Sequence, residues 1–299
     1  MHRTLAVPDG YQFSATVGQL PMGGHDPCAR FAEGAFWLAA RTPDGPGSVS
    51  LRQAGLSIEV EAYGAGASWL LDRAGQLAGL SDDLGDFAEL AQAHPLVAEL
   101  ARLHRGHRLP ATGQVFPRVL RAVFEQKVTG KEAYHAYSGT VRKFSERAPG
   151  PHEALWLPPD PAVIAAAPYW EFHPLGVEQR RADTLRRAAA EASRLERCSD
   201  TATATKRLLS IAGIGPWTAA EVVRASYGDA DAVSVGDYHL PNTVAWALAG
   251  EARADDRRML ELLAPFAGHR ARVCALLGLA GIGAPRRGPR MPLRSFARY

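Results

Sequence analysis

The stretch 208–240 constrains the fold more than any other part of the chain, because it puts a pair of glycines between two helical segments. It reads LLSIAGIGPWTAAEVVRASYGDADAVSVGDYHL. Gly213 and Gly215 accept positive φ and let another backbone come close, so the helix before them must end there. Pro216 suits the first turn of a new helix, where its missing N–H loses no hydrogen bond. The sequence therefore predicts a helix, a tight hairpin and a second helix over about 217–227.

The predicted hairpin is suited to binding an anion. Neither glycine carries a side chain, so the amides around Ile214 and the start of the second helix can point together at one ligand. The dipole of the second helix favours negative charge at the same place. Phosphate is the expected ligand.

A single carboxylate, Asp237, follows the apolar stretch 232–235 at the point where a further helix should begin. An aspartate there is often a helix cap, which contributes about 1 kcal/mol. It is also a candidate catalytic carboxylate at the mouth of a cleft. The local sequence leaves both roles open, and they do not exclude each other.

Residues 208–240 resemble the helix-hairpin-helix motif and catalytic-aspartate loop of the DNA glycosylase superfamily. The resemblance is to the alkylation-repair branch called 3-methyladenine DNA glycosylase II, where the aspartate follows the tryptophan of G-I-G-x-W-T-A by about twenty residues. Trp217 and Asp237 stand twenty positions apart. The resemblance implies that Asp237 is catalytic and that Trp217 walls the pocket for the damaged base, although core packing is the alternative role for Trp217.

The activity implied by this resemblance is that of a monofunctional DNA glycosylase in base excision repair. Such an enzyme flips an alkylated purine, such as 3-methyladenine or 7-methylguanine, out of the duplex and hydrolyses its N-glycosidic bond. Relatives that also cut the strand carry a lysine at the position of Trp217, whose amine forms a Schiff base, so no lyase activity is expected. A glycosylase for deaminated or bulky adducts remains an alternative, as does a non-catalytic helix-hairpin-helix DNA-binding protein. The expected partner is double-stranded DNA containing damaged bases, bound by a monomer.

Further pocket residues follow from the resemblance. Phe266 comes after a proline, where the family has an aromatic residue, usually tryptophan, that stacks on the extruded base. Glu221, one helical turn after Trp217, replaces an aromatic residue found in some relatives, and it either selects a cationic or amino-bearing base or faces solvent. Tyr169 and Trp170 can stack on a base, although aromatic residues between helices are more often core.

A second segment, 119–129, resembles the family's A-I-x-x-Q-x-V-S motif, whose following loop wedges into DNA where the base leaves. Gln126 matches the glutamine of that motif, and a buried amide bonded to backbone is an equal alternative for it. Lys127 adds a charge that can reach a phosphate. The full set of expected DNA-binding residues is Gly213, Ile214, Gly215, Thr218, Gln126, Lys127 and Thr129.

Composition narrows the class of protein. The 299 residues are 46% hydrophobic and 22% charged, as in globular proteins. No run approaches the roughly 18 apolar residues of a membrane helix, and no signal peptide is apparent, so a cytoplasmic protein is expected. The three cysteines are far apart, and His104 and His107 lack a third ligand, so neither a metal nor a cofactor is expected. The net charge of +3 is too small to indicate nucleic-acid binding by itself.

The predicted fold class is α+β. Residues 11–63 carry short β-prone runs between turn signals, which indicates an antiparallel sheet. Beyond residue 80 the pattern is almost entirely helical. We therefore expect an N-terminal antiparallel α/β domain over 1–79 and a helical helix-hairpin-helix glycosylase domain over 80–299, with two helical lobes, a central cleft and a basic C-terminal tail. The tail arginines are Arg286, Arg287, Arg290, Arg294 and Arg298.

Overall fold

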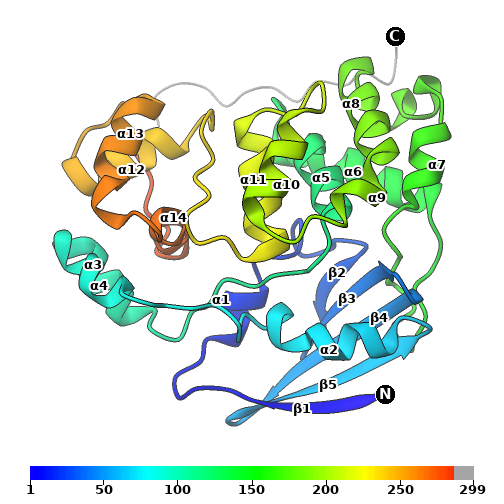
Figure 1. The fold of residues 1–299 in the computed structure, drawn as a ribbon, viewed down its shortest axis with the longest axis horizontal. Coiled ribbons are helices and arrows are strands. Elements are labelled where there is room, and N and C mark those ends of the chain that lie inside the picture. The colour runs from blue at the N-terminus through cyan, green and yellow to red at the C-terminus, as the bar shows by residue number, and fades with distance from the viewer. Residues whose placement is uncertain (286–299) are drawn as a thin grey trace.

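A computed structural model describes residues 1–285, and the arginines of the expected basic tail lie outside this range. An antiparallel sheet comes first in the chain and helices make up nearly all of the rest, which confirms the α+β class. Figure 1 shows three parts: the sheet, a central group of helices that includes α11, and a group formed by α3, α4 and α12 to α14. None of the helices in residues 1–285 is long and apolar enough to cross a membrane.

The sheet has five antiparallel strands in the order β1-β5-β4-β3-β2. In β5, burial alternates, with Ile58, Val60 and Ala62 turned into the core, as expected for a strand with one covered face. The sequence prediction began at residue 11 and therefore missed the first strand. The strands are β1 (His2–Ala6), β2 (Ala29–Ala32), β3 (Ala35–Thr42), β4 (Gly45–Ala54) and β5 (Ser57–Gly64).

Different parts of the chain cover the two faces of this sheet. Helices α1 (Phe13–Val17) and α2 (Ala67–Leu77) share one core with the strands. On another part of the sheet, Trp37 packs against Leu155 and Leu157, which belong to a segment returning from the helical region. Residues far beyond position 79 therefore complete the packing around the sheet.

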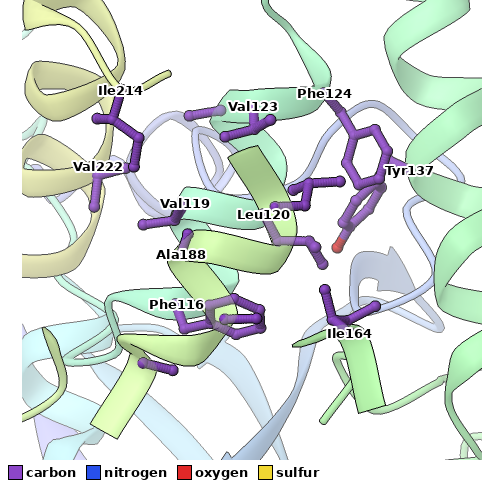
Figure 2. Packing of buried hydrophobic residues seen from close by; sticks show 14 of the residues in the cluster. Phe116, Val119, Leu120, Val123, Phe124, Tyr137, Ile164, Ala188, Ile214 and Val222 are labelled. Atoms are coloured by element: carbon purple, nitrogen blue, oxygen red, sulfur yellow. The ribbon is translucent and has the colours of Figure 1, made fainter. Parts of the chain in front are cut away.

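The central lobe is organised around α5, which contacts α6, α8 and α11. Figure 2 shows Phe116, Val119 and Leu120 of α5 in the same buried cluster as Ala188 of α8 and Val222 of α11. The lobe contains α5 (Phe116–Phe124), α6 (Gly130–Phe144), α7 (Pro161–Ala166), η2 (Tyr169–Glu171), η3 (His173–Leu175), α8 (Gln179–Ala190), α9 (Ala192–Leu195), α10 (Thr201–Leu209) and α11 (Pro216–Tyr227).

The second lobe is built from two stretches that are far apart in the sequence. Phe87 and Val97, from the first stretch, pack in one core with Val244 and Met259 from the last third of the chain. The lobe contains α3 (Phe87–Leu90), η1 (Ala91–Ala93), α4 (Pro95–Leu103), α12 (Leu240–Ala249), α13 (Asp256–Leu263), η4 (Ala264–Phe266) and α14 (Arg270–Leu279).

The segment 228–239 links α11 of the central lobe to α12 of the second lobe. Its Asp231 carboxylate accepts hydrogen bonds from the backbone N–H groups of Gly268 (2.9 Å) and Arg270 (3.1 Å). Next to this contact, the guanidinium of Arg272 in α14 forms a buried ion pair of 2.7 Å with Asp82. The segment that carries Asp237 is therefore fixed to the start of α14.

Candidate active site between two helical lobes

The hairpin forms as the sequence predicts, but its two glycines do different things. Gly213 has φ +102°, and a Cβ there would lie 2.0 Å from the Thr184 hydroxyl of α8, so only glycine fits. Gly215 has φ −106°, which any residue can adopt, and a Cβ there would meet open space. The expected need for positive φ therefore holds at Gly213 alone.

The start of α11 carries amides that no protein group uses within the described part of the chain. The Ile214 N–H already donates to the Ile211 carbonyl (3.0 Å), and its side chain is buried in the central core (Figure 2). Within residues 1–285, no acceptor faces the N–H groups of Gly215, Trp217 and Thr218. These three amides, and not that of Ile214, are available to an anion.

Gln126 joins the loop after α5 to the hairpin. Its side-chain amide donates to the Gly213 carbonyl (3.1 Å) and to the Thr218 hydroxyl (2.9 Å). Thr218 is 2% exposed, so its hydroxyl faces this amide and not the surface. This geometry favours the alternative role weighed for Gln126, that of an amide bonded within the protein.

The loop between α5 and α6 presents the Lys127 side chain to solvent. Lys127 is exposed and has φ +53°, an uncommon backbone for a residue with a side chain. Thr129 is instead the cap of α6, where its hydroxyl accepts from the Glu132 N–H (3.3 Å) and the Glu132 carboxylate accepts from the Thr129 N–H (2.8 Å). Of the three residues expected to bind DNA here, Lys127 is the one that offers a charge at the surface.

Asp237 lies where the second lobe begins. One carboxylate oxygen, Oδ1, accepts from the N–H groups of His239 (2.7 Å) and Leu240 (2.8 Å) at the start of α12. The other, Oδ2, accepts from the indole Nε1–H of Trp217 on α11 (3.0 Å). A carboxylate offers about four lone-pair sites, so one site on Oδ2 remains open. The same side chain thus caps a helix and is held by the central lobe.

Glu221 is bonded within the protein and is not free at the surface. Its carboxylate accepts from the Ser234 hydroxyl and pairs with the Arg224 guanidinium. Burial disfavours the charged form, but these two partners outweigh it and hold the pKa of the Glu221 carboxyl below its usual range. Neither role considered for Glu221, a free charge in the pocket or a solvent-facing residue, matches this arrangement.

Two further titratable groups lie around this ion pair. Burial raises the pKa of the Glu125 carboxyl at the end of α5, with the nearby charge of Glu221 acting in the same direction. Burial also raises the pKa of the Cys274 thiol of α14 to about 12, and the charges of Arg224, Glu221 and Asp237 all act on that thiol. Helix α5 contacts α11, and the Arg272 N–H of α14 donates to the Ala230 carbonyl in the aspartate segment (3.0 Å), so these elements meet near the ion pair.

Three aromatic residues expected in the pocket lie elsewhere. Phe266 is 1% exposed in the core of the second lobe, so its ring has no free face for a base, which corrects that expectation. Tyr169 and Trp170 belong to η2, beside α8. The Tyr169 hydroxyl bonds to His173 (2.8 Å), and Trp170 is 70% exposed. Figure 1 shows α8, which η2 contacts, on the side of α11 away from α12.

Four residues at the junction were missed by the sequence analysis. Arg224 follows Glu221 by three positions, a helical ion-pair spacing that could have revealed it. Tyr238 directly follows Asp237 and is 83% exposed, the most exposed large aromatic side chain of residues 1–285. Ser234 and Cys274 had no signal, because tertiary packing alone brings them here. No group of three or more His, Cys, Asp or Glu side chains in the described part of the chain is arranged to hold a metal ion.

The N-terminal antiparallel sheet and the helical lobes that follow it form a fold that solved DNA glycosylases share. The solved 3-methyladenine DNA glycosylase of Archaeoglobus fulgidus has this fold, with a TM-score of 0.78 and 16% identity, over 93% of this chain and 97% of that one. The 8-oxoguanine glycosylase/lyase of Clostridium acetobutylicum, solved with double-stranded DNA, superposes with a TM-score of 0.68 and 13% identity over 91% and 92% of the two chains.

Sequence relatives agree with these neighbours. The Bacillus subtilis protein YfjP, named as a DNA-3-methyladenine glycosylase, is 27% identical over 147 residues, or 47% of this chain and 50% of YfjP. The Mycobacterium tuberculosis protein AlkA, named as a bifunctional transcriptional activator and DNA repair enzyme, is 26% identical over 243 residues, or 79% of this chain and 49% of AlkA. The chain thus spans about half the length of these relatives, and no family model matches it. Its relatives and structural neighbours are helix-hairpin-helix DNA glycosylases, which supports its assignment to that superfamily.

Proposed function

We propose that this protein is a monofunctional DNA glycosylase of base excision repair that removes alkylated purines such as 3-methyladenine and 7-methylguanine. The observation that carries the proposal is the Asp237 carboxylate, held at the junction of two lobes by Trp217 and by the first amides of α12. It lies in the segment that links the hairpin helix α11 to α12, with one lone pair of Oδ2 open. The partner is double-stranded DNA that contains a damaged base.

The proposed role of Asp237 is to stabilise positive charge on the sugar. A base inside a duplex must first rotate out, and this unstacking costs a few kcal/mol, least for a damaged base. As the base leaves, the deoxyribose gains oxocarbenium character, which a fixed carboxylate beside it stabilises. The open lone pair of Oδ2 serves this charge directly or orients the attacking water. An N3- or N7-alkylated purine already carries positive charge and leaves as a neutral base, so the reaction needs little general acid.

Strand cleavage is not part of the proposal, because the sequence from the hairpin to the aspartate contains no lysine that could supply an amine. The lysines of the chain are Lys127, Lys131, Lys143 and Lys206, and none lies in the hairpin, in α11 or in the aspartate segment. A Schiff base with the sugar requires such an amine. We expect an intact abasic strand as product and no adduct trapped by borohydride; a trapped adduct would show that another amine attacks the sugar.

The free amides of Gly215, Trp217 and Thr218 supply the proposed contact with the DNA backbone. Phosphates look alike at every site, so this contact positions the enzyme without reading sequence or damage. The exposed Lys127 next to the hairpin adds a charge of the right sign. Specificity for the lesion must then come from the junction around Trp217, Asp237 and the exposed Tyr238.

Release of free bases from alkylated DNA tests the proposed function. Duplex DNA treated with a methylating agent is incubated with the protein, and the released bases are identified by mass spectrometry. We expect 3-methyladenine and 7-methylguanine from the wild type and neither from Asp237→Asn at equal concentration. A parallel incubation uses duplexes that carry deaminated or bulky bases. Release of those bases with none from methylated DNA would keep the glycosylase and change its substrate class, and no release from either substrate would refute the proposal.

A further inference from the structure

Helix α11 holds the aspartate segment at two points one helical turn apart. Trp217 and Glu221 are four positions apart, so their side chains leave the same face of the helix. Both are bonded to the short turn formed by residues 234–237, which carries the proposed catalytic group.

The first point of attachment is the indole of Trp217. Its Nε1–H donates to Oδ2 of Asp237 at 3.0 Å, while two backbone amides hold Oδ1. The amides alone would let the carboxylate pivot about Oδ1. The hydrogen bond from the Trp217 indole comes from a different helix and prevents this rotation of the carboxylate. The open lone pair of Oδ2 is therefore held in one direction.

The second point of attachment is Glu221. Its carboxylate accepts from the hydroxyl of Ser234, which is 6% exposed. The Ser234 carbonyl in turn accepts from the Asp237 N–H (3.2 Å), closing the turn. Arg224 pairs with the same carboxylate and keeps it charged, and a charged acceptor makes the stronger hydrogen bond.

We propose that Trp217 and Glu221 are positioning residues that fix the Ser234–Asp237 turn to α11 and so aim the Asp237 carboxylate. This inference rests on the proposed function, in which that carboxylate acts on the sugar. It assigns Trp217 a role as hydrogen-bond donor, which differs from a wall of the base pocket. It also gives the charged Glu221, found where some relatives have an aromatic residue, a task that does not involve the base.

Single-turnover kinetics separate positioning from binding, because the maximal rate reports the aimed carboxylate and the half-saturating concentration reports DNA affinity. Trp217→Phe keeps an aromatic ring and removes the N–H, so the maximal rate should fall about ten- to hundredfold, as for a lost bond to a charged group. Ser234→Ala should reduce it about three- to tenfold. Half-saturation should move less than about twofold in both variants.

Matched variants show whether the loss is specific. Ser226→Ala removes another buried hydroxyl, which is 1% exposed and lies on α11 itself. This hydroxyl is bonded to the Gln114 carbonyl (2.9 Å) and not to the Ser234–Asp237 turn. It should lower thermal stability about as much as Ser234→Ala and leave the maximal rate unchanged. Ser234→Thr retains the hydroxyl and should restore most of the rate. Equal rate losses in Ser226→Ala and Ser234→Ala would reduce Ser234 to a merely structural residue and overturn the inference.

A readout independent of activity keeps the inference separate from the proposed function. The indole ¹⁵N–¹H resonance of Trp217 is assigned by its disappearance in Trp217→Phe. It should shift in Asp237→Ala and in Ser234→Ala but not in Ser226→Ala. If the wild type released no base, the proposed function would fail while this resonance would still show whether α11 fixes Asp237. The two-point attachment would be refuted if the Trp217 resonance did not shift in Ser234→Ala. It would also be refuted if Trp217→Phe kept the full maximal rate and bound lesion DNA more weakly.

Discussion

The first turns of α11 and α12 face the same junction, but their backbone N–H groups differ in whether the protein provides them with an acceptor. At α11, no protein acceptor within residues 1–285 meets the N–H groups of Gly215, Trp217 and Thr218. At α12, the N–H groups of His239 and Leu240 are both taken by Asp237. Every helix begins with such amides, so the difference comes from the residues that precede each helix.

Under the proposed function, the two helix starts would supply a binding site for phosphate and a reactive carboxylate. The glycine before α11 leaves the positive end of the helix open for an anion from outside. At the start of α12, the side-chain carboxylate of Asp237 is itself the anion, and the α12 amides and Trp217 hold it in position. We infer that the open start of α11 positions DNA, while the amides of α12 and the side chains of α11 together position the carboxylate that acts on it.

The largest predicted effect is a difference in the free energy of unfolding between alanine variants of the two hairpin glycines. Gly213→Ala should destabilise the fold by about 2–6 kcal/mol, because the new Cβ meets Thr184 at 2.0 Å and the residue keeps φ +102°. Gly215→Ala should change stability by less than about 0.5 kcal/mol. Urea unfolding of both variants measures the difference, and equal losses would contradict the contrast between the two positions.

The next effect concerns DNA affinity and uses the open position. Gly215→Val should weaken binding about ten- to hundredfold, the cost of one charge-assisted contact of roughly 1.5–3 kcal/mol, because the side chain stands where a phosphate must approach. Its φ of −106° adds no strain. The loss should be the same for damaged and undamaged duplexes at one fixed salt concentration.

Circular dichroism provides the control for Gly215→Val, since the comparison requires an unchanged fold. If the variant weakened binding to lesion DNA alone, or to neither duplex, the amides of α11 would not be the phosphate contact. Lys127 and the basic helices would then have to supply it.

A smaller effect is expected from the ion pair under the aspartate turn. The folded-state pKa of Glu221 is depressed, so its contribution is present above the unfolded pKa of about 4.3 and is lost as pH falls through the folded value. Glu221→Gln should therefore be less stable than the wild type at about pH 7, by about 0.5–1 kcal/mol, with the gap closing towards about pH 3. Unfolding curves at both pH values test this, and a gap that widens in acid would contradict the assignment.

Local sequence was sufficient for the hairpin, for the sheet except its first strand, and for the position of the aspartate. Gly213 and Pro216 carry their backbone requirements in their own chemistry, and the twenty-residue spacing from Trp217 to Asp237 carries the resemblance. Alternating burial in β5 likewise follows from its sequence. These features depend on neighbours close in the chain, which is why they could be predicted.

The contacts between lobes could not be predicted in the same way. Phe266 follows a proline as the resemblance requires, yet the packing of the second lobe buries its ring. Glu221 reads as an isolated acid, but its carboxylate pairs with Arg224 and accepts a hydrogen bond from a serine thirteen positions away. Tertiary packing decides which face of a short helical turn is buried and which distant loop packs against it. A single sequence does not reveal this packing.

The most direct test of the central claim is single-turnover excision by wild-type protein and Asp237→Asn on the same methylated duplex. The amide can still accept the two α12 hydrogen bonds, so fold and DNA affinity should be kept, but it cannot balance a developing cation. We predict that base release falls by at least about a hundredfold with a dissociation constant within about twofold of wild type. Excision by Asp237→Asn at near the wild-type rate would contradict the assignment of Asp237 as the catalytic carboxylate.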